Sequence, residues 1–598
     1  MHRPSRLLIA VVLALLAGAA CSSGAGKVAE SGKAAGTITT TAAPVPATTT
    51  APPTTTTTAA TTTTAPAPTT APAATTSPGG LRWAACGALQ CASLAVPRDY
   101  ADPAGPTLTL ALARRPARTP AARIGSLLIN PGGPGDSGVD DLPGELRSLT
   151  ATLQNRFDIV SWDPRGVERS APVHCSDPKA KPSSGGDDSG PPLDPAPTDD
   201  AGRKALADAY RAGGEACLQW SGDLLRHVGT DSTVEDLERI RIALGEDKLT
   251  FIGHSAGTLP GAVYADRYPQ HVRAFVLDGP IDPSLTLDQM THAQAVGFEG
   301  ALHSFFTWCD ATAACHWRPA DPDRTAAFNA LIARVRQQPL KASGNRIVGV
   351  DTFVSGVMSR LTARSKWPSL GDALAAAERG DGSPLATLAS NYQNAGASNA
   401  ADARQSILCL DHPAPTNPDD YPALAGASKA DAPVFGPVFT WAALSCGVWP
   451  APATLTPKPV RAAGSPPILV VGTTGDPATP QVWARALAEA SKAQAPVFGP
   501  VFTWAALSCG MWSVPSTLEP KPTRAPGAPP IMVVGTTGDP ATPQAWAEAL
   551  AGQLERGVLV LRQGAEHVAY YYSACVRRLV DAYVVDGRPP ASGTTCAS

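Results

Sequence analysis

Short apolar runs alternate with helical patterns along most of the chain after residue 80. The runs are rich in Val, Ile and Leu and end in turn residues, which is typical of strands buried on both faces of a parallel sheet. Strands are therefore predicted at Ser126–Asn130, Asp158–Trp162, Leu249–Gly253, Ala274–Asp278, Ile468–Gly472, Ile531–Gly535 and Val558–Arg562. Helical patterns such as Thr233–Leu244 and Pro260–Tyr268 lie between them. This alternation predicts an α/β fold with a mostly parallel sheet covered by helices on both faces.

The strand pattern fades between residues 287 and 425, where Ala-rich helical segments dominate. We interpret 287–425 as a helical lid inserted into the sheet-forming part of the chain. The core then has an N-terminal part at 81–286 and a C-terminal part at 426–598. A chain of 598 residues is long enough for a large core and such an insertion.

The N-terminus has the pattern of an export signal. Arg3 and Arg6 precede the apolar run Leu7–Ala17, which is too short to cross a bilayer, and small residues then lead to Cys21. The pattern resembles a bacterial lipobox, in which residues 1–20 are removed and Cys21 is lipidated. A plain secretory signal cut just before this cysteine is the alternative.

Residues 21–80 consist mostly of Thr, Ala and Pro. Such a segment has too few large apolar side chains to offset the entropy lost on folding, so we expect a disordered tether. The lipid anchor at its start is the only membrane attachment that we expect, because no other run reaches the ~18 apolar residues of a membrane helix. The protein is therefore expected at the cell surface, or secreted if the signal is a plain one.

The charge balance argues against a nucleic-acid partner. The chain has 48 Lys and Arg against 51 Asp and Glu, a formal net charge of -3, and no basic run that tracks phosphates. The sequence does not predict an oligomeric state.

The first candidate for chemistry is the segment Gly253-His254-Ser255-Ala256-Gly257, where a predicted strand meets a predicted helix. A G-x-S-x-G in this context forms a sharp turn that exposes the serine at the carboxyl end of the sheet. We therefore predict that Ser255 is a nucleophile.

A second glycine-rich turn, Asn130–Gly135, follows another predicted strand. Acyl transfer needs N–H donors aimed at the developing oxyanion, and glycines let the backbone approach without side chains in the way. Pro134 has no N–H, so we predict that Gly133 and Ala256 form the oxyanion hole.

A serine nucleophile also needs a base and an acid that orients the base. Of the ten histidines, His567 has the position expected of the base, because it follows the predicted strand Val558–Arg562 and lies downstream of the serine. Two aspartates are candidates for the acid, Asp539 and Asp476, since each follows an apolar run and begins the sequence Asp-Pro-Ala-Thr-Pro.

The two aspartates belong to a tandem duplication. Residues 432–494 and 495–557 are strongly similar at an offset of 63 residues. Two copies are too few for a solenoid, which needs about three or more repeats. Asp539 is the preferred acid because its copy joins directly to the strand before His567, although the sequence leaves Asp476 open.

Cysteine counting agrees with a duplication. Without Cys21 the chain has eleven cysteines, and removing one duplicated cysteine leaves ten, enough for five disulfides in an oxidising compartment. Spacing suggests the pairs Cys86–Cys91, Cys309–Cys315, Cys575–Cys596 and Cys175–Cys217, with Cys409 joined to Cys446 or Cys509.

Three further charged residues invite functional labels. Asp163 and Arg165 follow a predicted strand, and we interpret them as structural ion-pair residues that hold a loop. Glu299, in the predicted lid, is a weaker candidate for the anion that an aminopeptidase needs to pair with its substrate's ammonium group.

Together, Asn130–Gly135 (NPGGPG), Asp163–Gly166 (DPRG), Gly253–Thr258 (GHSAGT), the Thr-Gly-Asp-Pro-Ala-Thr-Pro run and His567 resemble the α/β-hydrolase exopeptidases. The similarity covers residues 81–598 and points to the tripeptidyl aminopeptidases and proline iminopeptidase-like exported enzymes of actinobacteria. It implies an α/β-hydrolase fold with a helical lid, and hydrolysis of short peptides from a free N-terminus without a cofactor or metal. Ala256 replaces the tyrosine common in that family, which bears on substrate preference.

Three hypotheses follow from the sequence. The first is an exported serine exopeptidase acting on peptides through an acyl-enzyme. The second is an esterase or lipase with the same Ser, His and Asp, because fold alone does not separate the two activities. The third is a catalytically inactive surface lipoprotein that only binds a partner, its active site spoiled by the duplication.

Overall fold

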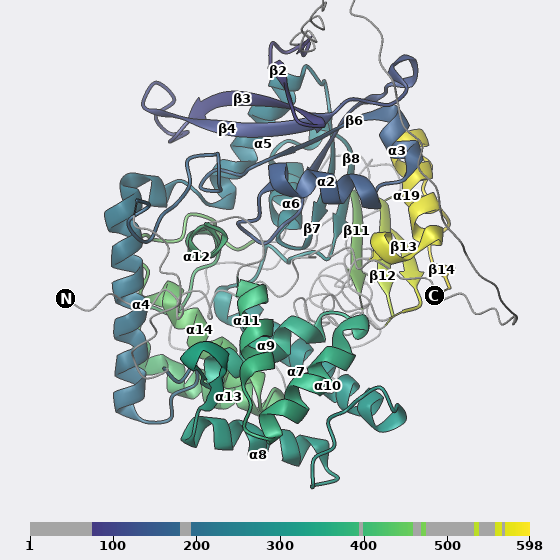
Figure 1. Cartoon of the computed structure of the whole chain (residues 1–598). Coiled ribbons are helices and arrows are strands. Elements are labelled where there is room, and N and C mark those ends of the chain that lie inside the picture. Colours follow the sequence, from purple (N-terminus) through teal and green to yellow (C-terminus); the bar gives the residue numbers. More distant parts are fainter. Residues whose placement is uncertain are drawn as a thin grey trace, which may run out of the picture.

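The computed structural model describes residues 75–179, 193–393, 399–458, 468–473, 531–537, 557–564 and 569–597. In this part of the chain a twelve-stranded sheet with flanking helices lies beside a separate layer of helices (Figure 1). The predicted α/β fold is confirmed. The sheet occupies the upper part of Figure 1 and the helical layer the lower part.

The sheet is antiparallel at its N-terminal end and parallel elsewhere. All pairs from β1 to β4 and the β4–β6 pair are antiparallel, whereas all pairs from β6 to β14 are parallel. In sheet order the strands are β1 Thr75–Thr76, β2 Arg82–Cys86, β3 Leu89–Pro97, β4 Thr107–Arg115, β6 Phe157–Trp162, β5 Gly125–Asn130, β7 Leu249–His254, β8 Val272–Asp278, β11 Ile468–Thr473, β12 Ile531–Thr536, β13 Gly557–Arg562 and β14 Thr594–Cys596. All seven predicted strands are present.

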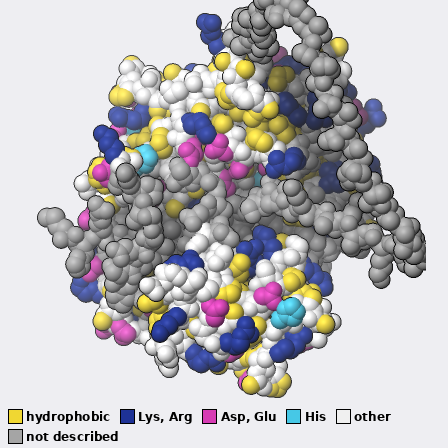
Figure 2. Space-filling model, in the orientation of Figure 1, with side chains coloured by type: hydrophobic (Ala, Val, Ile, Leu, Met, Phe, Trp, Pro, Cys, Tyr) yellow, Lys and Arg dark blue, Asp and Glu magenta, His cyan; other side chains and the backbone are white. Residues whose placement is uncertain are grey.

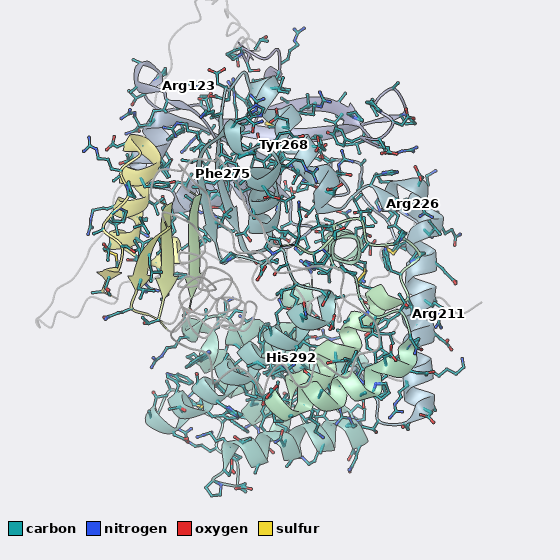
Figure 3. The ribbon with its side chains drawn as sticks, turned by 180° about the vertical axis from the view of Figure 1, so that it is seen from behind. Arg123, Arg211, Arg226, Tyr268, Phe275 and His292 are labelled. Carbon is teal, nitrogen blue, oxygen red and sulfur yellow. A yellow bond between two sulfur atoms is a disulfide. The ribbon has the colours of Figure 1, made fainter. Side chains whose placement is uncertain are left out.

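Helices cover both faces of the sheet because neighbouring strand residues point to opposite sides. On β5, Leu127 and Ile129 pack with helices α2 (Gly138–Ser148), α3 (Ala151–Arg156) and α19 (Ala574–Asp586). Leu128, between them, packs on the other side with helices α5 (Thr230–Leu244) and α6 (Thr258–Arg267). The labelled Phe275 of β8 belongs to this second cluster (Figure 3).

The folded part of the chain begins before residue 81, the predicted start of the core. β1 lies inside the stretch predicted as the tether, and the next turn docks on the end of α5, where the Ser77 hydroxyl donates to the Ala243 carbonyl. The rest of the predicted tether and the signal, including Cys21, lie outside the described residues.

The helical layer contains the predicted lid. Its core is one large apolar cluster that also includes residues of α4 (Asp200–Ser221). Figure 3 labels His292 of α7, one of the helices of this layer. α13 crosses the predicted boundary at residue 425, and α14 packs against α7, so the layer reaches Gly447. The helices of the layer are α7 Leu287–Ala311, α8 Arg324–Gln337, α9 Val350–Leu361, α10 Trp367–Glu378, α11 Ser383–Gln393, α12 Ala400–Asp411, α13 Tyr421–Asp431 and α14 Phe435–Gly447, with a small hairpin of β9 Leu340–Ala342 and β10 Arg346–Val348.

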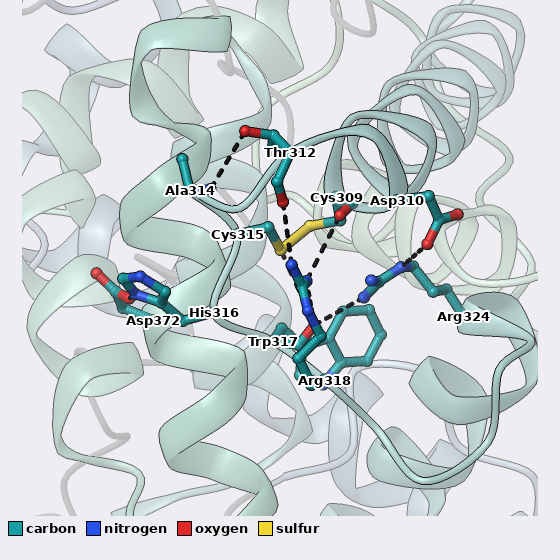
Figure 4. Close-up of a disulfide and its surroundings, with 10 residues drawn as sticks. All are labelled: Cys309, Asp310, Thr312, Ala314, Cys315, His316, Trp317, Arg318, Arg324 and Asp372. Atoms are coloured by element: carbon teal, nitrogen blue, oxygen red, sulfur yellow. Dashed lines mark hydrogen bonds and ion pairs between the residues drawn. A yellow bond between two sulfur atoms is a disulfide. The ribbon is translucent and has the colours of Figure 1, made fainter.

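Five disulfides join the described cysteines, in the pairs that the spacing suggests, and Cys446 is the partner of Cys409. Figure 4 shows one of them, Cys309–Cys315, at the end of α7. There Arg318 donates to the carbonyls of Thr312 and Trp317, which holds the turn that the disulfide closes. Disulfides are typical of proteins in an oxidising compartment.

Both copies of the duplication contribute a strand to the sheet. β11 comes from the first copy and pairs with β8, whereas β12 comes from the second copy and lies between β11 and β13. Equivalent residues stand side by side, with Val470 opposite Val533 and Thr473 opposite Thr536. The copies therefore fill two places in the sheet and do not compete for one.

Candidate active site

Ser255 stands in a strained turn between β7 and α6. Its φ of 51° lies in the left-handed region, which a side-chain-bearing residue seldom adopts, and a single 3-10 turn, Ser255–Gly257, leads into the helix. The Thr258 hydroxyl donates to the Ser255 carbonyl (2.6 Å) and accepts the Ile281 N–H (3.0 Å). This is the geometry expected of a nucleophile elbow at the carboxyl end of a strand.

Glycines are required where the elbow closes. A Cβ on Gly253 would lie 2.4 Å from the Gly257 carbonyl oxygen, and a Cβ on Gly257 would lie 2.6 Å from the Asn130 carbonyl oxygen. Both distances are far below a van der Waals contact. The two glycines of the predicted motif therefore let the turn pack against the end of β5.

The second predicted glycine turn lies directly against this elbow. A Cβ on Gly132, whose φ is 104°, would lie 2.4 Å from the His254 carbonyl oxygen. The Gly132 N–H is held by the Asn130 side chain at 3.0 Å. Gly133 and Ala256, the two predicted oxyanion donors, both line the cavity that Ser255 lines. The structure thus brings the predicted nucleophile and the predicted oxyanion loop together.

The cavity at Ser255 has a volume of about 50 Å³ and lies between the core and the helical layer. Most of its side chains are apolar, including Leu259 of α6, Met290 of α7, and Ile407 and Leu408 of α12. A cavity of this size holds one small group. These lid residues could not be identified from the sequence, because only the packing of α7 and α12 over the sheet brings them to the serine.

Two polar residues at the end of the lid helix α12 also line this cavity, Asp411 and His412. The Asp411 carboxylate accepts the Thr230 N–H (2.6 Å) and hydroxyl (2.7 Å) at the start of α5, while burial raises its pKa to about 7. The His412 Nδ1–H donates to the Leu285 carbonyl (3.1 Å), and burial lowers the pKa of this imidazole to about 4. His412 is therefore neutral at pH 7, with Nε2 left as an acceptor.

The candidate acids Asp476 and Asp539 and the candidate base His567 lie outside the described residues. The strands that precede them are described. β11, β12 and β13 run parallel to β7, so their carboxyl ends reach the sheet edge that carries Ser255. Each candidate follows its strand by only a few residues: Asp476 follows Thr473 by three and His567 follows Arg562 by five.

Asp163 and Arg165 are structural, although they do not pair with each other. The Asp163 carboxylate accepts the Ser137 hydroxyl (2.5 Å) and the Val139 N–H (3.1 Å), which holds the start of α2. Arg165 forms a fully buried bidentate pair with Asp236 of α5 (2.6 and 2.7 Å). Both residues thus fix the loop after β6 and stand outside the Ser255 cavity.

Glu299 has a structural role in the helical layer. The residue is 4% exposed, and its carboxylate accepts the N–H groups of Val434 (3.0 Å) and Phe435 (3.2 Å) at the start of α14. It does not line the cavity at Ser255. The hypothesis that it pairs with a substrate ammonium group has no support in this geometry.

None of the helices in the described part of the chain has the length and apolar character needed to span a bilayer. On the face shown in Figure 2, Lys and Arg side chains are interspersed with Asp and Glu.

The proteins to which this chain is similar are named as hydrolytic enzymes. Residues 432–495 and again 495–596 match the family described as TAP-like protein. The chain is 31% identical over 529 residues to the serine protease Hip1 of Mycobacterium tuberculosis, covering 85% of this chain and 88% of that protein. It is 33% identical over 421 residues to the tripeptidyl aminopeptidase of Streptomyces coelicolor, covering 67% and 76%. It is also 33% identical over 401 residues to carboxylesterase B of Mycobacterium tuberculosis, covering 65% and 76%.

Proposed function

The chain belongs to the family of TAP-like α/β-hydrolases, and on that premise we propose that it is an exported serine peptidase that releases short peptides or residues from free N-termini. The observation that carries the proposal is the contact between the left-handed Ser255 elbow and the Gly132 turn. This contact supports the proposal because acyl transfer requires a serine oxygen beside backbone donors.

The proposed mechanism is acyl transfer through a covalent intermediate. His567 takes the proton of the Ser255 hydroxyl as the oxygen attacks a peptide carbonyl, and it then protonates the leaving amine. Water releases the acyl group in a second step, with the same imidazole acting as base. The N–H groups of Gly133 and Ala256 stabilise the oxyanion in both steps.

Asp539 is proposed as the acid that orients the His567 imidazole and stabilises its cation. The second family match, 495–596, runs from the copy with Asp539 through the histidine, whereas the first match, 432–495, ends before it. β12, the strand before Asp539, is also the direct neighbour of β13. Both observations favour Asp539 over Asp476.

Preference for short peptides is supported by the lid. Helices α7 and α12 lie over the sheet edge and leave a cavity of about 50 Å³ beside Ser255. A folded protein does not fit under such a cover, so the substrate that we propose is the free end of a flexible peptide. The similarity to the tripeptidyl aminopeptidase is consistent with this view.

Labelling with a fluorophosphonate probe tests the serine mechanism. Wild type is expected to label at Ser255, and Ser255→Ala is expected to lose all labelling while it keeps the fold. Thr258→Ser serves as the control, since it keeps the hydroxyl that holds the elbow. If folded wild type does not label, the protein is the inactive surface lipoprotein of the third hypothesis.

An esterase is the second candidate, because one of the relatives is named carboxylesterase B. The two activities are separated by matched substrates: a tripeptide anilide with a free N-terminus, the same anilide acetylated at the N-terminus, and a short acyl ester. Hydrolysis of the free peptide well above the acetylated one supports the exopeptidase. Slow hydrolysis of both peptide anilides together with fast hydrolysis of the ester supports the esterase.

Export with a lipid anchor remains part of the proposal. The five disulfides support an extracytoplasmic location. Growth of an expressing actinobacterial host with a labelled fatty acid tests the anchor. Label in wild type and none in Cys21→Ser supports lipidation, whereas an unlabelled, secreted wild type indicates a plain signal.

A further inference from the structure

Three segments that adjoin predicted site residues in the sequence meet at the Glu145 side chain. Glu145 belongs to α2, the helix that follows the oxyanion turn. His254 immediately precedes Ser255 in the elbow. Tyr571 belongs to helix α18 (Ala569–Tyr572) and follows His567 by four residues. The three side chains lie together although their segments are distant in the sequence.

The contacts are specific. The Tyr571 hydroxyl lies 3.0 and 3.1 Å from the two carboxylate oxygens of Glu145, to which it donates. The His254 Nε2 is 3.7 Å from the same carboxylate, and its ring lies 5.0 Å from the ring of Tyr571. On its other side, the His254 Nδ1 faces the carboxylate of Asp278 at 3.7 Å.

The side chains that make these polar contacts are mostly buried. The side chains of His254 and Glu145 are only 6% and 12% exposed, so their interactions are weakly screened by water. A cavity of about 240 Å³ is lined by His254, Glu145 and Tyr571. Tyr571 also packs at the edge of the apolar cluster that includes α2 and α19, and its hydroxyl adds a directional contact to Glu145.

We propose that Glu145 and Tyr571 are positioning residues for His567, because their hydrogen bond ties α18, the helix that follows this histidine, to α2 beside the elbow of Ser255. The inference rests on the proposed function, because it concerns the position of the proposed base. A base must come within about 3 Å of the hydroxyl that it deprotonates. Since α18 begins two residues after His567, a shift of α18 moves the end of the segment that carries the imidazole.

The test compares Tyr571→Phe with Tyr572→Phe. The first change removes only the hydroxyl that donates to Glu145, and the second removes the hydroxyl of a neighbouring, 51% exposed tyrosine. Misplacement by about 1 Å costs on the order of 100-fold in rate, so we expect Tyr571→Phe to lower kcat about tenfold or more. KM and the melting temperature are expected to stay near those of wild type, and Tyr572→Phe to match wild type throughout.

Two carboxylate variants distinguish positioning from general packing. Glu145→Gln keeps an oxygen that accepts the tyrosine hydroxyl, whereas Glu145→Leu does not, so the glutamine variant should retain more of kcat. A double variant, Tyr571→Phe with Glu145→Leu, should lose little more than Glu145→Leu alone, because both changes break one contact. Additive losses, or equal losses in the two glutamate variants, would overturn the proposal.

A second measurement does not depend on activity. Hydrogen exchange in the elbow, residues 250–258, and at the start of α19 should both speed up in Tyr571→Phe and stay unchanged in Tyr572→Phe. If wild type hydrolyses no substrate, the proposed function fails and the exchange data still decide whether the tie exists. Unchanged exchange in Tyr571→Phe, or unchanged kcat in an active protein, contradicts the inference.

Discussion

β11 and β12 have almost the same sequence, ILVVGT and IMVVGT, and different neighbours. β11 lies beside β8, on the side of Ser255, whereas β12 lies beside β13, the strand that precedes His567 in the sequence. Because their register aligns equivalent residues, the two strands end at the same level of the sheet. The comparison shows that two strands of nearly the same sequence run in the same direction in one sheet and still have different neighbours.

The duplication also places one more strand between β7 and β13. From β7 to β13 the sheet has the four steps β7–β8, β8–β11, β11–β12 and β12–β13, and one copy would leave three. At roughly 4.8 Å per step, β13 lies about 19 Å from β7 instead of about 14 Å. The contact that we propose between His567 and Ser255 therefore has one more strand spacing to cross.

The largest expected effect comes from removing one acid or the other. Replacing the acid that orients a catalytic histidine lowers kcat by about 10⁴-fold. We expect a loss of this size in Asp539→Asn and a change below about threefold in Asp476→Asn, because only β12 adjoins β13. Steady-state hydrolysis of a free tripeptide anilide measures both. A large loss in Asp476→Asn alone would show that the first copy supplies the acid.

Deleting one copy should narrow the site. Removal of residues 474–536 joins Thr473 to Thr537 and leaves a single strand followed by Asp539. With β13 one step closer to β7, we expect fluorophosphonate labelling of Ser255 to become about tenfold faster. Deletion of residues 432–494 instead gives nearly the same sequence, so this variant should show the same increase in the labelling rate. A folded deletion variant that labels more slowly than wild type would show that the extra strand is required.

The two duplicated cysteines should differ in their effect on stability. Cys446 closes a loop to Cys409, 37 residues away, so its loss in Cys446→Ser should lower the free energy of unfolding by about 3–4 kcal/mol. Cys509→Ser should change it by less than about 0.5 kcal/mol. Urea unfolding without reductant measures both values. The reverse order would mean that the second copy provides the disulfide of the helical layer.

The smallest effect tests whether β12 is an integral strand. Val534 of β12 and Val560 of β13 are register partners, both fully buried in one apolar cluster. Val534→Ala and Val560→Ala should each lower the free energy of unfolding by about 2 kcal/mol. A much smaller cost for Val534→Ala would indicate that β12 contributes little to the core, and that β11 is the functional copy.

Much of the fold could be predicted from local sequence. Strands such as Leu249–His254 are continuous apolar runs, and disulfides such as Cys86–Cys91 join residues that are close in the chain. The elbow could also be predicted, since its glycines and Ser255 are adjacent. The sequence did not show that both copies enter the sheet, because two nearly identical strands carry little information about their order.

The cavity residues of the lid could not be predicted for a different reason. His412 follows no strand and belongs to no motif, and it lines the Ser255 cavity only because α12 packs across α5. The link between Glu145 and Tyr571 likewise joins residues 426 positions apart. Such contacts arise from tertiary packing, which no local pattern of polar and apolar residues encodes.

The central claim is that one hydroxyl, one imidazole and one carboxylate converge at the edge of this sheet. A crystal structure of the protein with a phosphonate bound to Ser255 tests it most directly. We expect an imidazole nitrogen of His567 within about 3 Å of the Ser255 oxygen and the carboxylate of Asp539 at the other ring nitrogen. His567 beyond hydrogen-bonding reach, or Asp476 in the place of Asp539, would contradict the account.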